Sequence, residues 1–183
     1  MKKLVVIVAI AMAALASQAA TFKWSTTSTG KIYEAGSTTA LLASGTAYLF
    51  DQAVVTQASL VEAFAAGTLN LASKTSVDSN SVVDGALATQ VATYGNVGSS
   101  YTFYVAILKD DALYIGPTKT GAGQEGKDTP LAFSAKTSSQ AAALDASAGY
   151  SAAGWYTASV PEPTSGLLML LGMAGLALRR RRA

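Results

Sequence analysis

Carboxylates spread along the middle of the chain are the side chains with which it could do chemistry, because the sequence holds no histidine and no cysteine. Their absence removes Ser-His and Cys-His nucleophiles and most zinc sites. Two carboxylates flanking a glycosidic bond suffice for hydrolysis, so a glycan-active enzyme is the catalytic class left open. The candidates are Glu34, Asp51, Asp78, Asp84, Asp110, Asp111, Glu125, Asp128 and Asp145. Most stand beside Gly, Ser, Lys or another Asp, which is typical of turns, so we expect no catalytic activity.

The stretch from Asp78 to Gly85 begins like a calcium loop but does not continue like one. Val82 stands where an oxygen ligand is needed, the glycine comes late, and no Glu closes the loop. Asp110 and Asp111 could share a cation, although a charged hairpin turn is the favoured interpretation. We therefore expect no metal and no cofactor.

The N-terminal residues have the order of charge, apolar run and small residues that is typical of a secretory signal peptide. Lys2 and Lys3 come first, residues 4–16 are apolar, and Ser17 and Ala19 are small. An uncleaved N-terminal anchor is the alternative, although the apolar run is short against the about 20 residues of a membrane helix.

Signal cleavage is expected after Ala19, with Ala16 or Ala20 as alternative sites. The expected partners at this step are the Sec export machinery and a signal peptidase. The chain then divides into a signal peptide at 1–19, an exported core at 20–159 and a tail at 160–183.

The core is weakly acidic once the basic residues of both ends are set aside. It holds seven basic and ten acidic residues and no arginine, although the whole chain has a net charge of +2. Phosphate contacts need clustered Lys and Arg, so nucleic acid is excluded as a partner.

The tail combines a proline-bounded start, a short apolar run and a basic end. Pro161, Glu162 and Pro163 impose an extended lead-in, because proline lacks an amide hydrogen and restricts the residue before it. A helix over 164–178 would be roughly 22 Å long, against a hydrocarbon thickness of about 30 Å. Basic residues beside a membrane helix stay in the cytoplasm, so the basic cluster at the end of the tail would place the core on the other side of the membrane. The cluster consists of Arg179, Arg180, Arg181 and Arg182.

In order and spacing, these features resemble the tail of the bacterial PEP-CTERM proteins, a tail also described as an ice-binding protein C-terminal domain. The resemblance implies that an exosortase, an integral-membrane cysteine transpeptidase, recognises Pro161 to Pro163 and processes the protein. The chain would then be anchored in the inner membrane only transiently, on its way to the cell surface or extracellular matrix, commonly in bacteria that make exopolysaccharide. A plain tail anchor is the alternative. The ice-binding label does not extend to the core, where Thr-x-Thr occurs only at 27–29 and 118–120.

The residue pattern of the core predicts a β-rich α+β fold, that is, a single small domain with an antiparallel sheet. The apolar alternation in 101–108, the turn at 109–112 and the apolar return at 113–115 predict a hairpin. Further strands are expected at 47–50, 22–24 and 155–157.

The first and last strands are expected to pair in one sheet, and residues 118–129 to form an exposed loop. One helix is expected at 57–66, with Ser59 and Glu62 at capping-box spacing and Gly67 ending it. A second, weaker helix is expected at 140–145. A signal helix and a C-terminal transmembrane helix would flank the domain.

Four aromatic residues could stack on sugars if exposed, but burial is the favoured expectation, since each removes a large apolar area from water. They are Trp24, Trp155, Tyr150 and Tyr156. Together these patterns predict an exported surface or matrix protein, structural or polysaccharide-associated. A secreted carboxylate-based glycan-active enzyme with the same tail is the alternative.

Overall fold

The long strand β6 (Ser100–Lys109) lies at the centre of the larger of two sheets. The protein is described here by a computed structural model, which covers residues 18–134 and 142–158. The larger sheet has eight strands in the order β10-β11-β7-β6-β2-β3-β4, with β8 also pairing with β6. Its other members are β2 (Ser44–Asp51), β3 (Asp78–Val83), β4 (Ala86–Leu87), β7 (Ala112–Ile115), β8 (Lys119–Ala122), β10 (Ala143–Asp145) and β11 (Gly154–Thr157).

The smaller sheet has three strands in the order β5-β1-β9. They are β1 (Ala19–Thr26), β5 (Gln90–Asn96) and β9 (Asp128–Phe133). Most strand pairs are antiparallel as expected, whereas β1 with β9 and β10 with β11 are parallel. A β-rich domain is thus confirmed, with a mixed rather than a purely antiparallel pairing.

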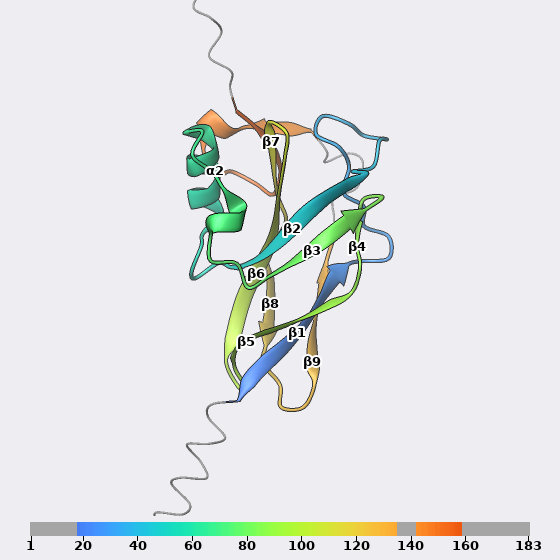
Figure 1. The fold of residues 1–183 in the computed structure, drawn as a ribbon, viewed down its shortest axis with the longest axis vertical. Coiled ribbons are helices and arrows are strands. Elements are labelled where there is room, and N and C mark those ends of the chain that lie inside the picture. The colour runs from blue at the N-terminus through green and yellow to red at the C-terminus, as the bar shows by residue number, and fades with distance from the viewer. Residues whose placement is uncertain (1–17, 135–141, 159–183) are drawn as a thin grey trace, which may run out of the picture.

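Strand β6 has both faces covered. The predicted alternation is confirmed, because Phe103, Val105 and Ile107 lie in one core together with side chains of the smaller sheet such as Phe22 and Trp24. The opposite face of the larger sheet packs against α2 (Gln57–Ala65) and the short 3₁₀ helices η1 (Leu71–Ser73) and η3 (Ala146–Ala148). Figure 1 shows α2 and the smaller sheet on different sides of β2 and β6. The larger sheet is therefore the middle layer.

The predicted hairpin is confirmed, since β6 and β7 pair antiparallel with Lys109 opposite Ala112. Only Asp110 and Asp111 connect them. Asp110 has a φ of 50°, a left-handed conformation that Asp tolerates better than most residues. The short strands expected at 47–50, 22–24 and 155–157 are also present, within β2, β1 and β11.

The predicted helix is confirmed over Gln57–Ala65, but its start differs from the expected capping box. The N-cap is Thr56, whose hydroxyl accepts a hydrogen bond from the backbone N–H of Ser59. Because the N-cap lies three residues earlier than expected, Glu62 falls within the helix. The end agrees with expectation: Gly67 has a φ of +66° and donates its N–H to the carbonyl of Phe64.

Two stretches expected as helix or loop form strands instead. Residues 143–145, expected to be helical, form β10 and pair in parallel with β11, so tertiary pairing outweighs the local helical preference of an Ala-rich segment. The expected loop at 118–129 contains β8 and the start of β9. Gly121 suits this strand, because a Cβ there would lie 2.9 Å from Leu131 Cδ2.

The expected pairing of the first and last strands is wrong. Strand β1 belongs to the smaller sheet, whereas β11 pairs with β7 and β10 in the larger one. Trp24 of β1 and Trp155 of β11 nevertheless belong to the same hydrophobic core. The two strands thus lie in different sheets and bury side chains in one core.

Several predicted features lie outside the described residues. The signal peptide as far as Ser17 and the start of the weaker helix are two of them. The third is the whole tail, with Pro161 to Pro163 and Arg179 to Arg182. Ala19 is described and begins β1, and the carbonyl of Gln18 accepts the N–H of Val97 at 2.9 Å. In the part of the chain that is described, no helix has the length and apolarity to cross a membrane.

Candidate functional site

Asp51 is the most buried of the candidate carboxylates and ties the two sheets together. It ends β2 and is 5% exposed. Its Oδ2 accepts a hydrogen bond from the Tyr94 hydroxyl of β5 at 3.0 Å, and its Oδ1 accepts the N–H of Ala53 at 3.0 Å. Both oxygens are therefore engaged by groups of the protein itself, one of them across the layers.

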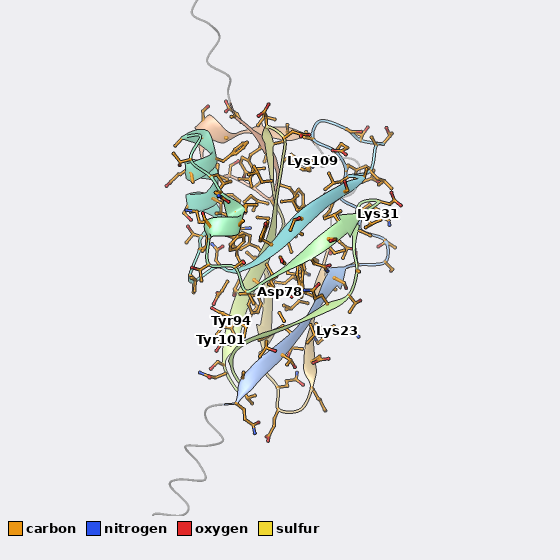
Figure 2. All side chains as sticks on the ribbon, viewed as in Figure 1. Lys23, Lys31, Asp78, Tyr94, Tyr101 and Lys109 are labelled. Atoms are coloured by element: carbon orange, nitrogen blue, oxygen red, sulfur yellow. The ribbon has the colours of Figure 1, made fainter. Side chains whose placement is uncertain are left out.

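Asp78, at the start of β3, makes a second connection of the same kind. Its Oδ2 accepts the indole N–H of Trp24 in β1 at 2.9 Å. The side-chain amide of Gln90 in β5 donates to both carboxylate oxygens at 2.9 Å. Figure 2 shows Asp78 in the middle of the molecule. Two of the carboxylates that the sequence offered for catalysis, Asp51 and Asp78, thus join the larger sheet to the smaller one.

The other candidate carboxylates lie at the surface. Glu34 forms an ion pair with Lys109 at 2.7 Å. Hydrogen bonds from the side chain and the backbone N–H of Ser147 lower the pKa of Asp145, which caps η3. The remaining carboxylates are exposed, at the ends of strands or in turns: Asp84, Asp110, Asp111, Glu125 and Asp128.

The stretch that begins like a calcium loop forms β3 and a two-residue turn. Asp84 and Gly85 have φ values of 49° and 69°, and Val83 pairs with Ala86 on either side of them. The Asp-Gly pair, a strong hairpin signal, could have indicated this turn from the sequence. Among the residues that the structure describes, no three His, Cys, Asp or Glu side chains gather as metal ligands.

The four aromatics considered for sugar stacking are mainly buried, as favoured. Trp24, Trp155 and Tyr156 are at most 2% exposed, and the Trp155 indole donates to the Tyr33 carbonyl at 2.7 Å. Tyr150 is half-buried and stacks on Tyr156. Any aromatic contact with a ligand must therefore come from other residues.

A surface groove of about 480 Å³ lies beside Asp51, between the end of β2 and the start of β6. Polar side chains predominate in its lining, which consists of Asp51, Gln52, Ala53, Ser100, Tyr101 and Thr102. Asp51 is its one charged residue. The sequence did not indicate this groove, because about a third of the core separates its two walls along the chain and they meet only through pairing of β2 with β6.

The half-buried ring of Tyr101 is held firmly in the groove. A Cβ added to Gly95 would lie 2.2 Å from the ring, so the ring lies directly over this glycine. The Tyr101 hydroxyl accepts the N–H of Asn96 at 2.8 Å, and the Tyr94 ring meets it edge-on at a centroid distance of 5.3 Å. Figure 2 shows Tyr94 and Tyr101 side by side at one flank of the molecule. The Tyr101 ring, which belongs to a residue of the groove lining, is therefore fixed in position by its neighbours.

Burial, the hydrogen bond to Asp51 and the negative charge of that carboxylate raise the pKa of Tyr94 to about 12. The phenol consequently stays protonated at neutral pH and remains a hydrogen-bond donor to Asp51. This donor also holds the carboxylate at the groove in one orientation.

The comparison with known protein families finds a match in the tail. Residues 159–182 match the PEP-CTERM protein-sorting motif. The chain carries a PEP-CTERM sorting tail. This confirms the resemblance seen in the sequence, and the motif marks an exported, membrane-transiting protein that an exosortase processes. No curated protein and no solved structure matches the chain.

The PEP-CTERM motif begins directly after the folded domain. Thr157 ends β11 opposite Ala112, Ala158 is half-buried, and residue 159 is the first of the matched range. The domain and the sorting motif therefore adjoin one another without a long linker.

Proposed function

We propose that this chain is a non-enzymatic protein of the cell surface or extracellular matrix whose domain binds a neutral exopolysaccharide through the groove at Asp51 and Tyr101. Its delivery uses the N-terminal signal peptide and the Sec machinery, and the tail spans the inner membrane transiently with its C-terminus in the cytoplasm. The fixed Tyr101 ring among polar groups is the observation that carries the proposal.

The chemistry of the groove suits a sugar chain. A sugar ring has an apolar C–H face, which packs against an aromatic ring, and a rim of hydroxyls that need hydrogen-bond partners. Gln52, Ser100 and Thr102 also line the groove and carry groups that donate and accept hydrogen bonds, and Asp51 adds a carboxylate oriented by Tyr94. Because the one charge in the lining is negative, a neutral chain is favoured over an anionic one.

Binding is favoured over hydrolysis by the number and state of the carboxylates. A glycosidase needs two of them flanking the scissile bond. The groove lining contains only Asp51, and its oxygens already accept hydrogen bonds from Tyr94 and Ala53. The other non-exposed aspartate, Asp78, is engaged by Trp24 and Gln90.

Binding is tested with the exported protein and the organism's own exopolysaccharide in a co-sedimentation assay. Tyr101→Leu removes the aromatic face, and Ser100→Trp fills the groove from an exposed position without removing a buried contact. Both variants should lose binding at least about tenfold, whereas Tyr48→Leu, at a half-buried tyrosine outside the groove, should bind normally. Equal retention of the polysaccharide by all three variants would refute the groove.

Two further measurements test the other parts of the proposal, which are the non-enzymatic role and the processing of the two ends of the chain. Turnover of the polysaccharide that disappears in Asp51→Asn would replace the binding function with the enzymatic alternative. The intact mass of the mature protein reports both processing events. An N-terminus at Ala20 would support the signal peptide, and unchanged processing after alanine replacement of Pro161 to Pro163 would show that the tail is a plain anchor.

A further inference from the structure

The place where the chain leaves the domain limits how an exosortase can approach it. Ala158 is the last described residue, and Pro161 follows three residues later. Consecutive Cα atoms are 3.8 Å apart, so the Pro161 Cα lies within about 11 Å of the Ala158 Cα. An enzyme that engages Pro161 to Pro163 must therefore come close to the surface around Ala158.

The surface around Ala158, here called the exit face, consists of the β6–β7 turn and the hollows on its two sides. One hollow, of about 300 Å³, includes Glu34, Lys109, Trp155 and Thr157 in its lining. The other, of about 230 Å³, is lined largely by the apolar side chains of Phe64, Leu69, Leu108 and Ala158. Asp110 and Asp111 line both hollows. Figure 1 shows β7 and the orange-red C-terminal end of the described chain at the same end of the molecule.

The exit face is acidic. Lys109 is paired with Glu34 at 2.7 Å, so its charge is balanced locally. Asp110 and Asp111 are exposed, and in the part of the chain that is described neither has an ion-pair partner. Anionic lipid headgroups repel such a pair, which disfavours adsorption of this end to the bilayer. A protein surface with basic groups, and an apolar side chain for the second hollow, complements it.

We propose that the exit face is a docking surface for the exosortase, which contacts Asp110 and Asp111 through basic residues on its extracytoplasmic side. The folded domain then contributes to recognition beyond the PEP-CTERM tail itself. Charges at the rim of an interface act mainly on the association rate, so the domain accelerates capture of the tail. This inference uses the tail match and the domain geometry, and it is independent of polysaccharide binding.

The test is a pulse-chase measurement of precursor processing in the native cells with the full chain. Asp110→Asn with Asp111→Asn removes both charges and keeps the turn, because Asn tolerates the left-handed φ of residue 110. The control, Glu125→Gln with Asp128→Asn, removes two exposed charges at the opposite end of the domain, near the start of β9.

The exit-face variant should be processed at least about threefold more slowly, and the control at the normal rate. Asp111→Lys should slow processing further, because it reverses one charge. Equal precursor half-lives in all variants would overturn the proposal. Faster processing after charge removal would also overturn it, since it would mean that the turn acts by repelling lipid. The urea midpoints of the released proteins check that each variant is folded.

Discussion

Tyr94→Phe tests whether the Tyr94–Asp51 hydrogen bond holds the two sheets together. The substitution deletes a hydroxyl that donates at 3.0 Å to a carboxylate that is 5% exposed. A hydrogen bond to a charged group contributes about 1.5–3 kcal/mol, and a buried acceptor left unpaired carries its desolvation cost. Asp51 keeps its second partner, the N–H of Ala53. We therefore expect a loss of about 2 kcal/mol, or roughly thirtyfold in the unfolding equilibrium constant.

The assay is urea unfolding of the exported protein at neutral pH, followed by tryptophan fluorescence. Tyr48→Phe is the matched control, because the Tyr48 ring packs near Phe50 and is half-buried. Among the described residues its hydroxyl makes no hydrogen bond between the sheets, so its deletion should change stability by less than about 0.5 kcal/mol. If the two variants lose the same stability, the hydrogen bond to Asp51 does not connect the sheets, and the case for Asp51 as a structural residue fails.

Alkaline pH and the helix start give two further predictions. Burial is the main cause that raises the pKa of Tyr94 to about 12, and it also raises the pKa values of Tyr104 and Tyr150. The folded state therefore keeps phenol protons that the unfolded chain loses near the ordinary pKa of 10.0. Stability should be constant from neutral pH to about pH 10 and fall from there toward pH 12, less steeply in Tyr94→Phe; a flat alkaline profile of urea midpoints would contradict this. Thr56→Ala should cost about 1 kcal/mol by removing the N-cap, and Ser59→Ala less than half of that; the reverse order in thermal unfolding would restore Ser59 as the cap.

Local patterns predicted the elements whose signals lie within a few neighbouring residues. The alternation in β6 and the turn residues at 109–112 were enough to predict the β6–β7 hairpin, because both signals are local. Gly67 likewise indicated the end of α2. Strand β10 was missed, since an Ala-rich stretch has no β pattern of its own and becomes a strand only beside β11.

The candidate site was less accessible to sequence reasoning. The sequence showed aspartates of catalytic type but not their partners, which lie far along the chain: Tyr94 for Asp51, and Trp24 with Gln90 for Asp78. Pairing of β2 with β6 brings the two walls of the groove together, and packing of the smaller sheet supplies the donors.

The sequence by itself determined that the protein is exported and sorted, because a PEP-CTERM tail is a contiguous signal read along the chain without a fold. It also excluded chemistry that depends on histidine or cysteine. The tertiary structure alone decided that Asp51 and Asp78 join the sheets, that Tyr101 lines a groove, and that Asp110 and Asp111 lie where the tail departs. Burial and hydrogen bonding are relations between distant residues, so only the folded chain defines them.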